Sequence, residues 1–127
     1  MENLLLSIYG KTITKIDIDD DSFYLECGDN TYRAYHMQDC CENVSVYDSN
    51  ITSCGCLGGT KIRSIHFEES GAWPDDVEQN QYVESFTWTT LTINTSCGKK
   101  LIVRFFGESN GYYSENVYFE RTHKRIT

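Results

Sequence analysis

The sequence predicts a mainly β protein: a single antiparallel β-sandwich or rolled sheet of about eight strands, with a short N-terminal helix. Three observations lead to this prediction. Short runs in which apolar and polar residues alternate recur along the chain. Turn-forming residues, mostly glycine, asparagine and aspartate, separate these runs. No mid-chain segment has the helical period that the crossover helices of a parallel sheet would need.

The first elements are a helix and a three-stranded meander. Residues 3–9 have the pattern of a short amphipathic helix, and Gly10 can end it because glycine accepts the left-handed conformation. The apolar period then changes to two, which is typical of half-buried strands. Joined by aspartate- and glycine-containing turns, these strands are expected at residues 15–18, 23–27 and 31–35.

The second half of the chain predicts five further strands, at residues 44–48, 62–67, 82–94, 99–106 and 115–120. The third and fourth of these five form the clearest hairpin, because both are rich in β-branched and aromatic residues and Thr95-Ser96-Cys97-Gly98 suits a turn. Residues 70–81 are expected to form an acidic loop. The basic tail, residues 121–127, is expected to fray.

One domain spanning residues 1–127 is expected. A chain of 127 residues with an apolar fraction of 39% can bury a single core, and its one proline argues against a linker. The inward positions of the strands predict the core: Ile16, Ile18, Phe23, Leu25, Val44, Val46, Ile65, Phe67, Leu91, Ile93, Leu101, Val103, Phe105, Val117 and Phe119.

The net charge of -8 argues against direct binding to nucleic acid, which needs a basic face. It suits a partner protein with a basic surface. The acidic residues gather in two clusters, at 17–21 and 68–78. Each cluster is either a solvated turn or a surface that imitates nucleic-acid phosphates toward a basic partner.

The sequence also predicts a cytoplasmic protein that does not enter a membrane. No stretch approaches about 20 apolar residues, and the N-terminus lacks the pattern of a signal peptide. Six cysteines are then expected to be free thiols, as in a reducing compartment.

Two dense polar and aromatic segments follow predicted strands. Motif 1 is residues 35–42, Tyr-His-Met-Gln-Asp-Cys-Cys-Glu, and motif 2 is residues 107–114, Gly-Glu-Ser-Asn-Gly-Tyr-Tyr-Ser. Loops held by a rigid sheet are where binding residues concentrate, and exposed aromatic residues suit a protein partner, although core packing could also absorb them. The predicted partner- or ligand-binding residues are His36, Gln38, Asp39, Cys40, Cys41, Glu42, Trp88, Glu108, Ser109, Asn110, Tyr112 and Tyr113.

The residue types of these motifs are compatible with three kinds of chemistry. Zinc could use His36 with Cys40 or Cys41 and the pair Cys54 and Cys56, but that spacing is unusual and no metal or cofactor is expected. A thiol enzyme could use His36, Asp39 and one of the adjacent cysteines, yet sequence neighbours seldom give the required angles, so no enzyme is expected.

Carboxylates of the two motifs could also converge on a cation or a sugar. Asp39, Glu42, Glu108 and Glu115 are the candidates. The competing interpretation is that residues 108–111 form a tight turn with side-chain-to-backbone hydrogen bonds, and that interpretation is favoured.

The chain resembles a family of small uncharacterised proteins encoded by bacteriophages and prophages. The residues that carry the resemblance are Gly10-Lys11-Thr12-Ile13, motif 1, Thr87-Trp88-Thr89 and the run from Arg104 to Glu115. It covers nearly the whole chain, and Cys54-Gly55-Cys56 and residues 70–81 depart from the family pattern. The resemblance implies a single β-rich domain of unknown function in a phage context.

This resemblance, joined to the charge, suggests a small acidic phage protein that binds and inhibits a host bacterial protein in the host cytoplasm. A component of anti-phage defence, CRISPR-type or other, is one such target. The alternatives are a small-ligand or metal-binding sponge, and a thiol or hydrolase enzyme using His36 and Cys40 or Cys41. The oligomeric state stays open.

Overall fold

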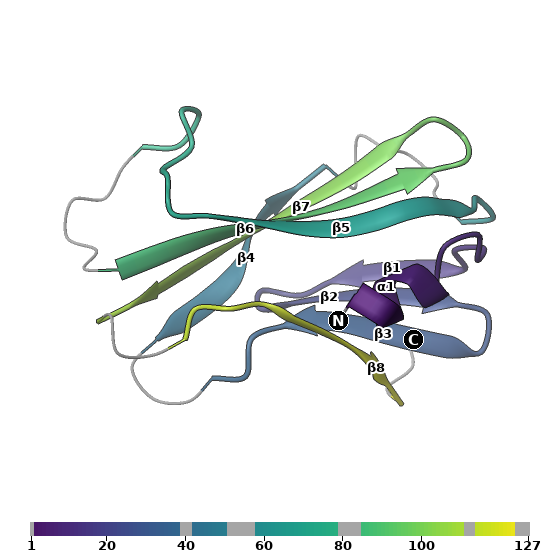
Figure 1. Cartoon of the computed structure of the whole chain (residues 1–127), viewed down its shortest axis with the longest axis horizontal. Helices are drawn as coiled ribbons and strands as arrows, with labels where there is room; N and C mark the ends of the chain where they lie inside the picture. Colours follow the sequence, from purple (N-terminus) through teal and green to yellow (C-terminus); the bar gives the residue numbers. More distant parts are fainter. Residues whose placement is uncertain (1, 39–41, 51–57, 79–84, 111–113, 124–127) are drawn as a thin grey trace.

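Two four-stranded antiparallel sheets pack face to face in the computed structural model of the chain (Figure 1). The structure describes residues 2–38, 42–50, 58–78, 85–110 and 114–123. The elements are α1 (Glu2–Ser7), β1 (Lys15–Ile18), β2 (Ser22–Cys27), β3 (Asn30–Tyr35), β4 (Asn43–Ser49), β5 (Ile62–Ser70), β6 (Ser85–Thr95), β7 (Lys100–Ser109) and β8 (Tyr118–Thr122). The predicted mainly β sandwich with a short N-terminal helix is confirmed.

The strand order is β1-β2-β3-β8 in one sheet and β4-β7-β6-β5 in the other. The predicted meander forms β1 to β3, and the predicted hairpin forms β6 and β7. Gly98 lies in the turn of this hairpin and has a φ of 85°. A backbone hydrogen bond from Val46 to Asp20, 2.8 Å long, ties β4 to the β1–β2 turn of the other sheet. The two layers are therefore joined at one side by hydrogen bonding as well as by the core.

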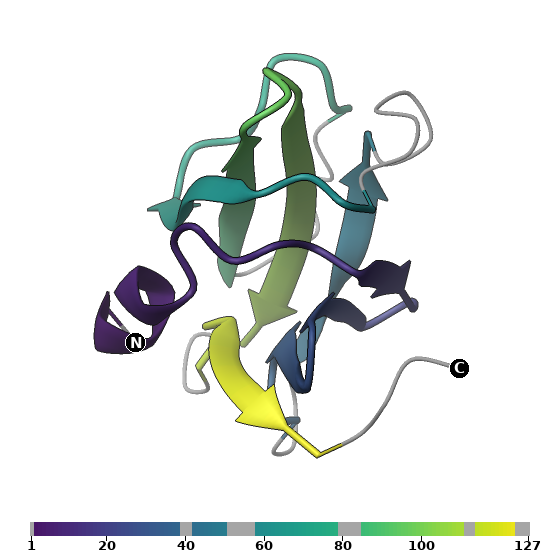
Figure 2. The ribbon, with the colours of Figure 1, turned by 90° about the vertical axis from the view of Figure 1, so that its right-hand side faces the viewer.

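The core lies between the sheets and contains every residue that the strand patterns predicted. Four of these residues, Ile16, Ile18, Val46 and Phe67, are partly buried, and the rest are buried. The core also takes in Ile8 and Ile13, which flank the end of the helix and were not predicted. Gly10 and Ile13 donate backbone hydrogen bonds to Ile62 and Thr60, so α1 lies beside β5 (Figure 2).

The strand ends on either side of motif 2 differ from the prediction. Glu108 and Ser109 belong to β7 and pair in register with Phe86 and Ser85 of β6, because a regular ladder satisfies more backbone groups than a local turn. At the other end of motif 2, β8 begins at Tyr118.

Two residues of the predicted frayed tail also belong to a strand. Arg121 and Thr122 pair in register with Tyr32 and Thr31 of β3. Pairing with a buried central strand supplies the backbone hydrogen bonds that composition alone could not reveal.

The chain crosses between the sheets twice at the same end of the sandwich. It leaves β3 for β4 through motif 1, and it leaves β7 for β8 through motif 2. Tyr35 pairs with Tyr118 where both crossovers meet the first sheet, and Asn43 pairs with Glu108 where both meet the second (Figure 1). The pairing of the strands thus sets the two crossovers side by side.

Candidate functional site

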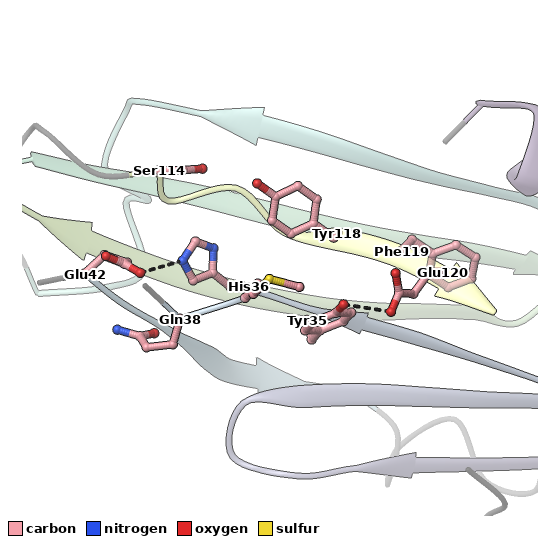
Figure 3. Close-up of a pocket in the computed structure, with 9 residues that line it drawn as sticks. Tyr35, His36, Gln38, Glu42, Ser114, Tyr118, Phe119 and Glu120 are labelled. Atoms are coloured by element: carbon pink, nitrogen blue, oxygen red, sulfur yellow. Dashed lines mark hydrogen bonds and ion pairs between the residues drawn. The ribbon is translucent and has the colours of Figure 1, made fainter. Parts of the chain in front are cut away.

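A pocket of about 720 Å³ opens where the two crossovers meet (Figure 3). Motif 1 and the end of β3 supply one wall, and the residues leading into β8, with β8 itself, supply the other. The lining residues are Tyr35, His36, Met37, Gln38, Glu42, Ser114, Tyr118, Phe119 and Glu120. The two walls, residues 35–42 and 114–120, are far apart in the sequence and share one concave site.

His36 connects the two walls. Its Nδ1 lies 2.6 Å from the backbone oxygen of Asn116, in the second crossover. Its Nε2 lies 3.2 Å from Oε1 of Glu42, at the end of motif 1, and both side chains are almost fully buried. The ring also stacks on Tyr118 with centroids 6.2 Å apart. One imidazole thus links motif 1 to the end of the second crossover and to the first residue of β8.

Glu120 and Tyr35 form the opposite end of the pocket (Figure 3). The Tyr35 hydroxyl donates a 2.7 Å hydrogen bond to Oε1 of Glu120. That bond raises the pKa of Tyr35 above its ordinary value, because the carboxylate holds the hydroxyl proton. The same bond orients the carboxylate of Glu120, which is otherwise exposed.

The rim of the pocket is apolar and exposed. Met37 has 66% of its surface exposed and Tyr118 has 41%. A thioether side chain adapts its shape to a contact surface, and tyrosine offers a stiff apolar ring with a polar tip. The site therefore combines an apolar rim with carboxylates inside.

Glu115 anchors the second crossover behind the pocket. It is 7% exposed, and it accepts hydrogen bonds from Thr87 Oγ1 at 2.8 Å and Ser109 Oγ at 2.5 Å. A Cβ atom on Gly107 would lie 3.1 Å from both the Cβ and the backbone oxygen of Glu115. Glycine at 107 thus lets the crossover approach β7 closely, and the buried carboxylate holds it there.

A family profile described as "Domain of unknown function (DUF7448)" matches residues 6–119. The chain belongs to this family. The match spans both motifs and reaches Phe119 in β8, so it includes nearly all of the pocket lining. No curated protein and no solved structure matches the chain.

The pocket of this DUF7448 domain contains His36, Gln38 and Glu42 of the predicted binding residues. Glu108 and Ser109 lie in β7, where Ser109 supports Glu115, and Asn110 is exposed just beyond the strand. The other predicted residues of the two motifs lie outside the described residues: Asp39, Cys40, Cys41, Tyr112 and Tyr113.

Trp88 lies away from the pocket. The sequence predicts it as a binding residue, but it lies within β6 and is only 3% exposed. Trp73, Tyr47 and Phe106 cover it, with ring centroids 5.4, 5.0 and 4.8 Å away. Trp73 comes from the predicted acidic loop, which therefore folds back onto the outer face of the second sheet as a small aromatic cluster.

Arg104 fastens this aromatic cluster. Its guanidinium bonds to Asp48 of β4 and to Asp76 of the loop, and it lies over the rings of Tyr47 and Trp88. The two carboxylates raise the pKa of Arg104, so the side chain stays charged. Asp76, in the acidic cluster at 68–78, thus forms a structural clamp with Arg104 that holds the loop against the sheet.

The sequence interpretation missed Tyr118, Phe119 and Glu120 as site residues. Their alternation predicted only a strand, and nothing in their spacing indicated that β8 would pair with β3 beside motif 1. Tyr35, Met37 and Ser114 lie inside the motifs but were not selected.

The structure also bears on the alternatives. Among the described residues, no group of three or more His, Cys, Asp and Glu side chains is arranged to hold a metal ion. The cysteines proposed for zinc or thiol chemistry (Cys40, Cys41, Cys54 and Cys56) lie outside these residues. Within the described part of the chain, no helix has the length and apolar character needed to cross a bilayer.

Proposed function

We propose that this DUF7448 domain is a protein-binding module that engages its partner at the pocket between the two crossovers. The observation that carries the proposal is the coincidence of that pocket with the exposed rim residues Met37 and Tyr118. Met37 has the largest exposed fraction of the large hydrophobic residues described as exposed. Exposed methionine and tyrosine beside a concavity are typical of protein recognition surfaces.

The charge of the chain favours a basic partner. The net charge is -8, and among the described residues the pocket lining contains Glu42 and Glu120 but no lysine or arginine. An acidic surface attracts a basic partner over long distances and raises the association rate. Binding of this kind is stoichiometric and needs no reacting group.

The biological setting that we propose is a phage protein that covers and inhibits a basic surface of a host protein. Its support is the resemblance of both motifs to small phage and prophage proteins, together with the acidic charge. A defence protein that handles nucleic acid, CRISPR-type or other, carries the kind of basic surface that such an inhibitor would fit.

A small-ligand binding protein is the second candidate function. The pocket volume, about 720 Å³, falls within the range of roughly 300–1,000 Å³ typical of small-molecule sites. The two candidate functions differ in what the pocket binds: a protein target in one case, and a small metabolite in the other.

Affinity capture with matched variants tests the proposal. The full chain, a Met37→Ser variant and a Leu6→Ser variant would each be used to capture proteins from bacterial lysate. Leu6 is a suitable control because it is 55% exposed in α1, outside the pocket lining. We expect the full chain and Leu6→Ser to retain the same protein at one equivalent, and Met37→Ser to lose it. Equal retention by both variants, or no retained protein at all, would overturn the proposal.

A further inference from the structure

We propose that the pocket receives a cationic side chain, the guanidinium of an arginine or the ammonium of a lysine, presented by the partner protein. This inference rests on the proposed function and specifies the chemistry of what enters the site. It is carried by the carboxylate of Glu120, the aromatic rings beside it and the pairing of the other charges in the pocket.

The two carboxylates of the pocket differ in whether a cation compensates their charge. Glu42 is paired with His36, at 3.2 Å. Among the described residues, the ion pairs are His36 with Glu42 and Arg104 with Asp48 and with Asp76, so Glu120 has no cationic partner there. The negative charge that the pocket offers to a ligand is therefore that of Glu120.

A hydrogen bond orients the carboxylate of Glu120. The Tyr35 hydroxyl donates to Oε1 at 2.7 Å, which leaves Oε2 available to a ligand. Arg33 pairs in register with Glu120, yet its Nε and Nη2 donate to Ser22 Oγ at 3.1 and 2.9 Å. The guanidinium of Arg33 is thus hydrogen-bonded to β2, and the described residues include no ion pair between it and the carboxylate of Glu120.

The rim of the pocket suits the apolar part of a cationic side chain. Arginine and lysine carry their charge on an aliphatic stem, which packs well against aromatic and thioether side chains. Tyr118 and Met37 offer such a surface at the rim, and aromatic faces attract cations. The chain itself shows this attraction, since the guanidinium carbon of Arg33 lies 4.1 Å from the ring centroid of Tyr35.

The test is an NMR titration of the isotope-labelled full chain at constant ionic strength. The probes are N-acetyl-arginine amide, N-acetyl-lysine amide and N-acetyl-citrulline amide, which has the shape of the arginine probe without its charge. We expect at least one cationic probe to shift the Met37 methyl and Tyr118 ring signals, and the stronger of the two identifies the side chain. The citrulline probe should leave these signals in place. Equal responses to arginine and citrulline, or no response to either cation, would overturn the inference.

Matched charge variants separate a defined site from general attraction to an acidic protein. Glu120→Gln should weaken binding of the cationic probe about two- to fivefold, the range of a partly exposed ion pair. Glu68→Gln makes the same change on an exposed residue of β5, outside the pocket lining, and should leave the affinity unchanged. Equal weakening by the two variants would refute a site at Glu120. Pocket-dependent protein capture without any cation response would retain the proposed function and reject this inference alone.

Discussion

His36 and Glu42 hold a proton between them. The backbone oxygen of Asn116 can only accept a hydrogen bond, so Nδ1 of His36 at 2.6 Å must carry a proton. Nε2 then faces Oε1 of Glu42 at 3.2 Å. A neutral imidazole would offer a lone pair to a carboxylate that also only accepts, so one of the two atoms must be protonated. This proton joins the parts of the pocket that come from motif 1 and from the second crossover.

We predict that His36 carries a proton on Nδ1 in the native protein. Long-range 1H–15N correlation spectra report which ring nitrogen is protonated. In Glu42→Gln the amide can donate to Nε2, so His36 should be a neutral ring protonated at Nδ1 alone. His66 and His123 are exposed and provide internal references. A His36 ring protonated only at Nε2 would contradict the predicted hydrogen bond to Asn116.

Removing the imidazole should also destabilise the fold. His36→Ala takes away one partner of a buried ion pair, and we expect the free energy of unfolding to fall by about 3 kcal/mol or more. His66→Ala, on the exposed side of β5, should change it by less than about 0.5 kcal/mol. Urea denaturation of both variants measures the difference, and similar losses would show that His36 has no special anchoring role.

Gly107 should be intolerant of a methyl group. A Cβ there would meet Val44 Cγ2 at 3.0 Å and the backbone oxygen of Glu115 at 3.1 Å. The backbone of Glu115 cannot move away without disturbing the second crossover. Gly107→Ala should therefore lower the free energy of unfolding by about 1–3 kcal/mol. The control is Gly71→Ala, because a Cβ at Gly71 meets nothing within 4 Å. Thermal or urea unfolding that ranks the two variants equally would contradict the close approach of the second crossover to β7.

Cys97 and Cys27 should differ in reactivity with pH. Hydrogen bonding to the hydroxyls of Thr95 and Thr60, with a backbone contribution from Lys99, lowers the pKa of exposed Cys97 to about 7. Burial raises the pKa of Cys27 to about 11. Because the thiolate is the reactive form, alkylation of Cys97 should rise through about pH 7, while Cys27 stays unmodified at pH 8.

Peptide mass spectrometry after iodoacetamide treatment follows each cysteine separately. Thr95→Val removes the main hydrogen bond to Cys97 and should move its alkylation midpoint to higher pH. An unchanged midpoint would show that the hydroxyl of Thr95 does not stabilise the thiolate.

Arg104 should hold the loop that contains Trp73 against Trp88. Arg104→Ala removes hydrogen bonds to Asp48 and Asp76, so we expect a loss of about 1–2 kcal/mol and a looser loop around Trp73. Both tryptophans of the chain lie in this cluster, so acrylamide quenching of their fluorescence reports its opening directly. Arg63→Ala, on an exposed position of β5, is the matched control and should leave quenching unchanged. Equal quenching in both variants would argue against the clamp.

Much of the fold could be predicted because period-two alternation depends only on which face of a strand is buried. Ile65, Leu91 and Val103 were assigned to the core on that basis and are fully buried. Strand ends were harder to predict. Whether Glu108 and Ser109 turn or continue β7 depends on Ser85 and Phe86, which are distant in sequence.

The outer aromatic cluster shows the same limit. Trp73 lies in a segment whose acidic residues predicted a solvated loop, whereas the position of its indole depends on Trp88, Phe86 and Phe106. Trp88 was selected as a binding residue because tryptophan is common at interfaces. Its burial follows from residues that local sequence around it does not reveal.

Composition and short-range pattern were enough to predict an antiparallel sandwich or rolled sheet, an acidic chain and two motifs rich in binding side chains. The shared pocket could be found only from the folded chain, since it follows from the pairing of β3 with β8 and of β4 with β7. Strand pairing joins residues such as Tyr35 and Tyr118 through backbone hydrogen bonds and shared burial. Those interactions depend on the whole sheet, so no local segment encodes them.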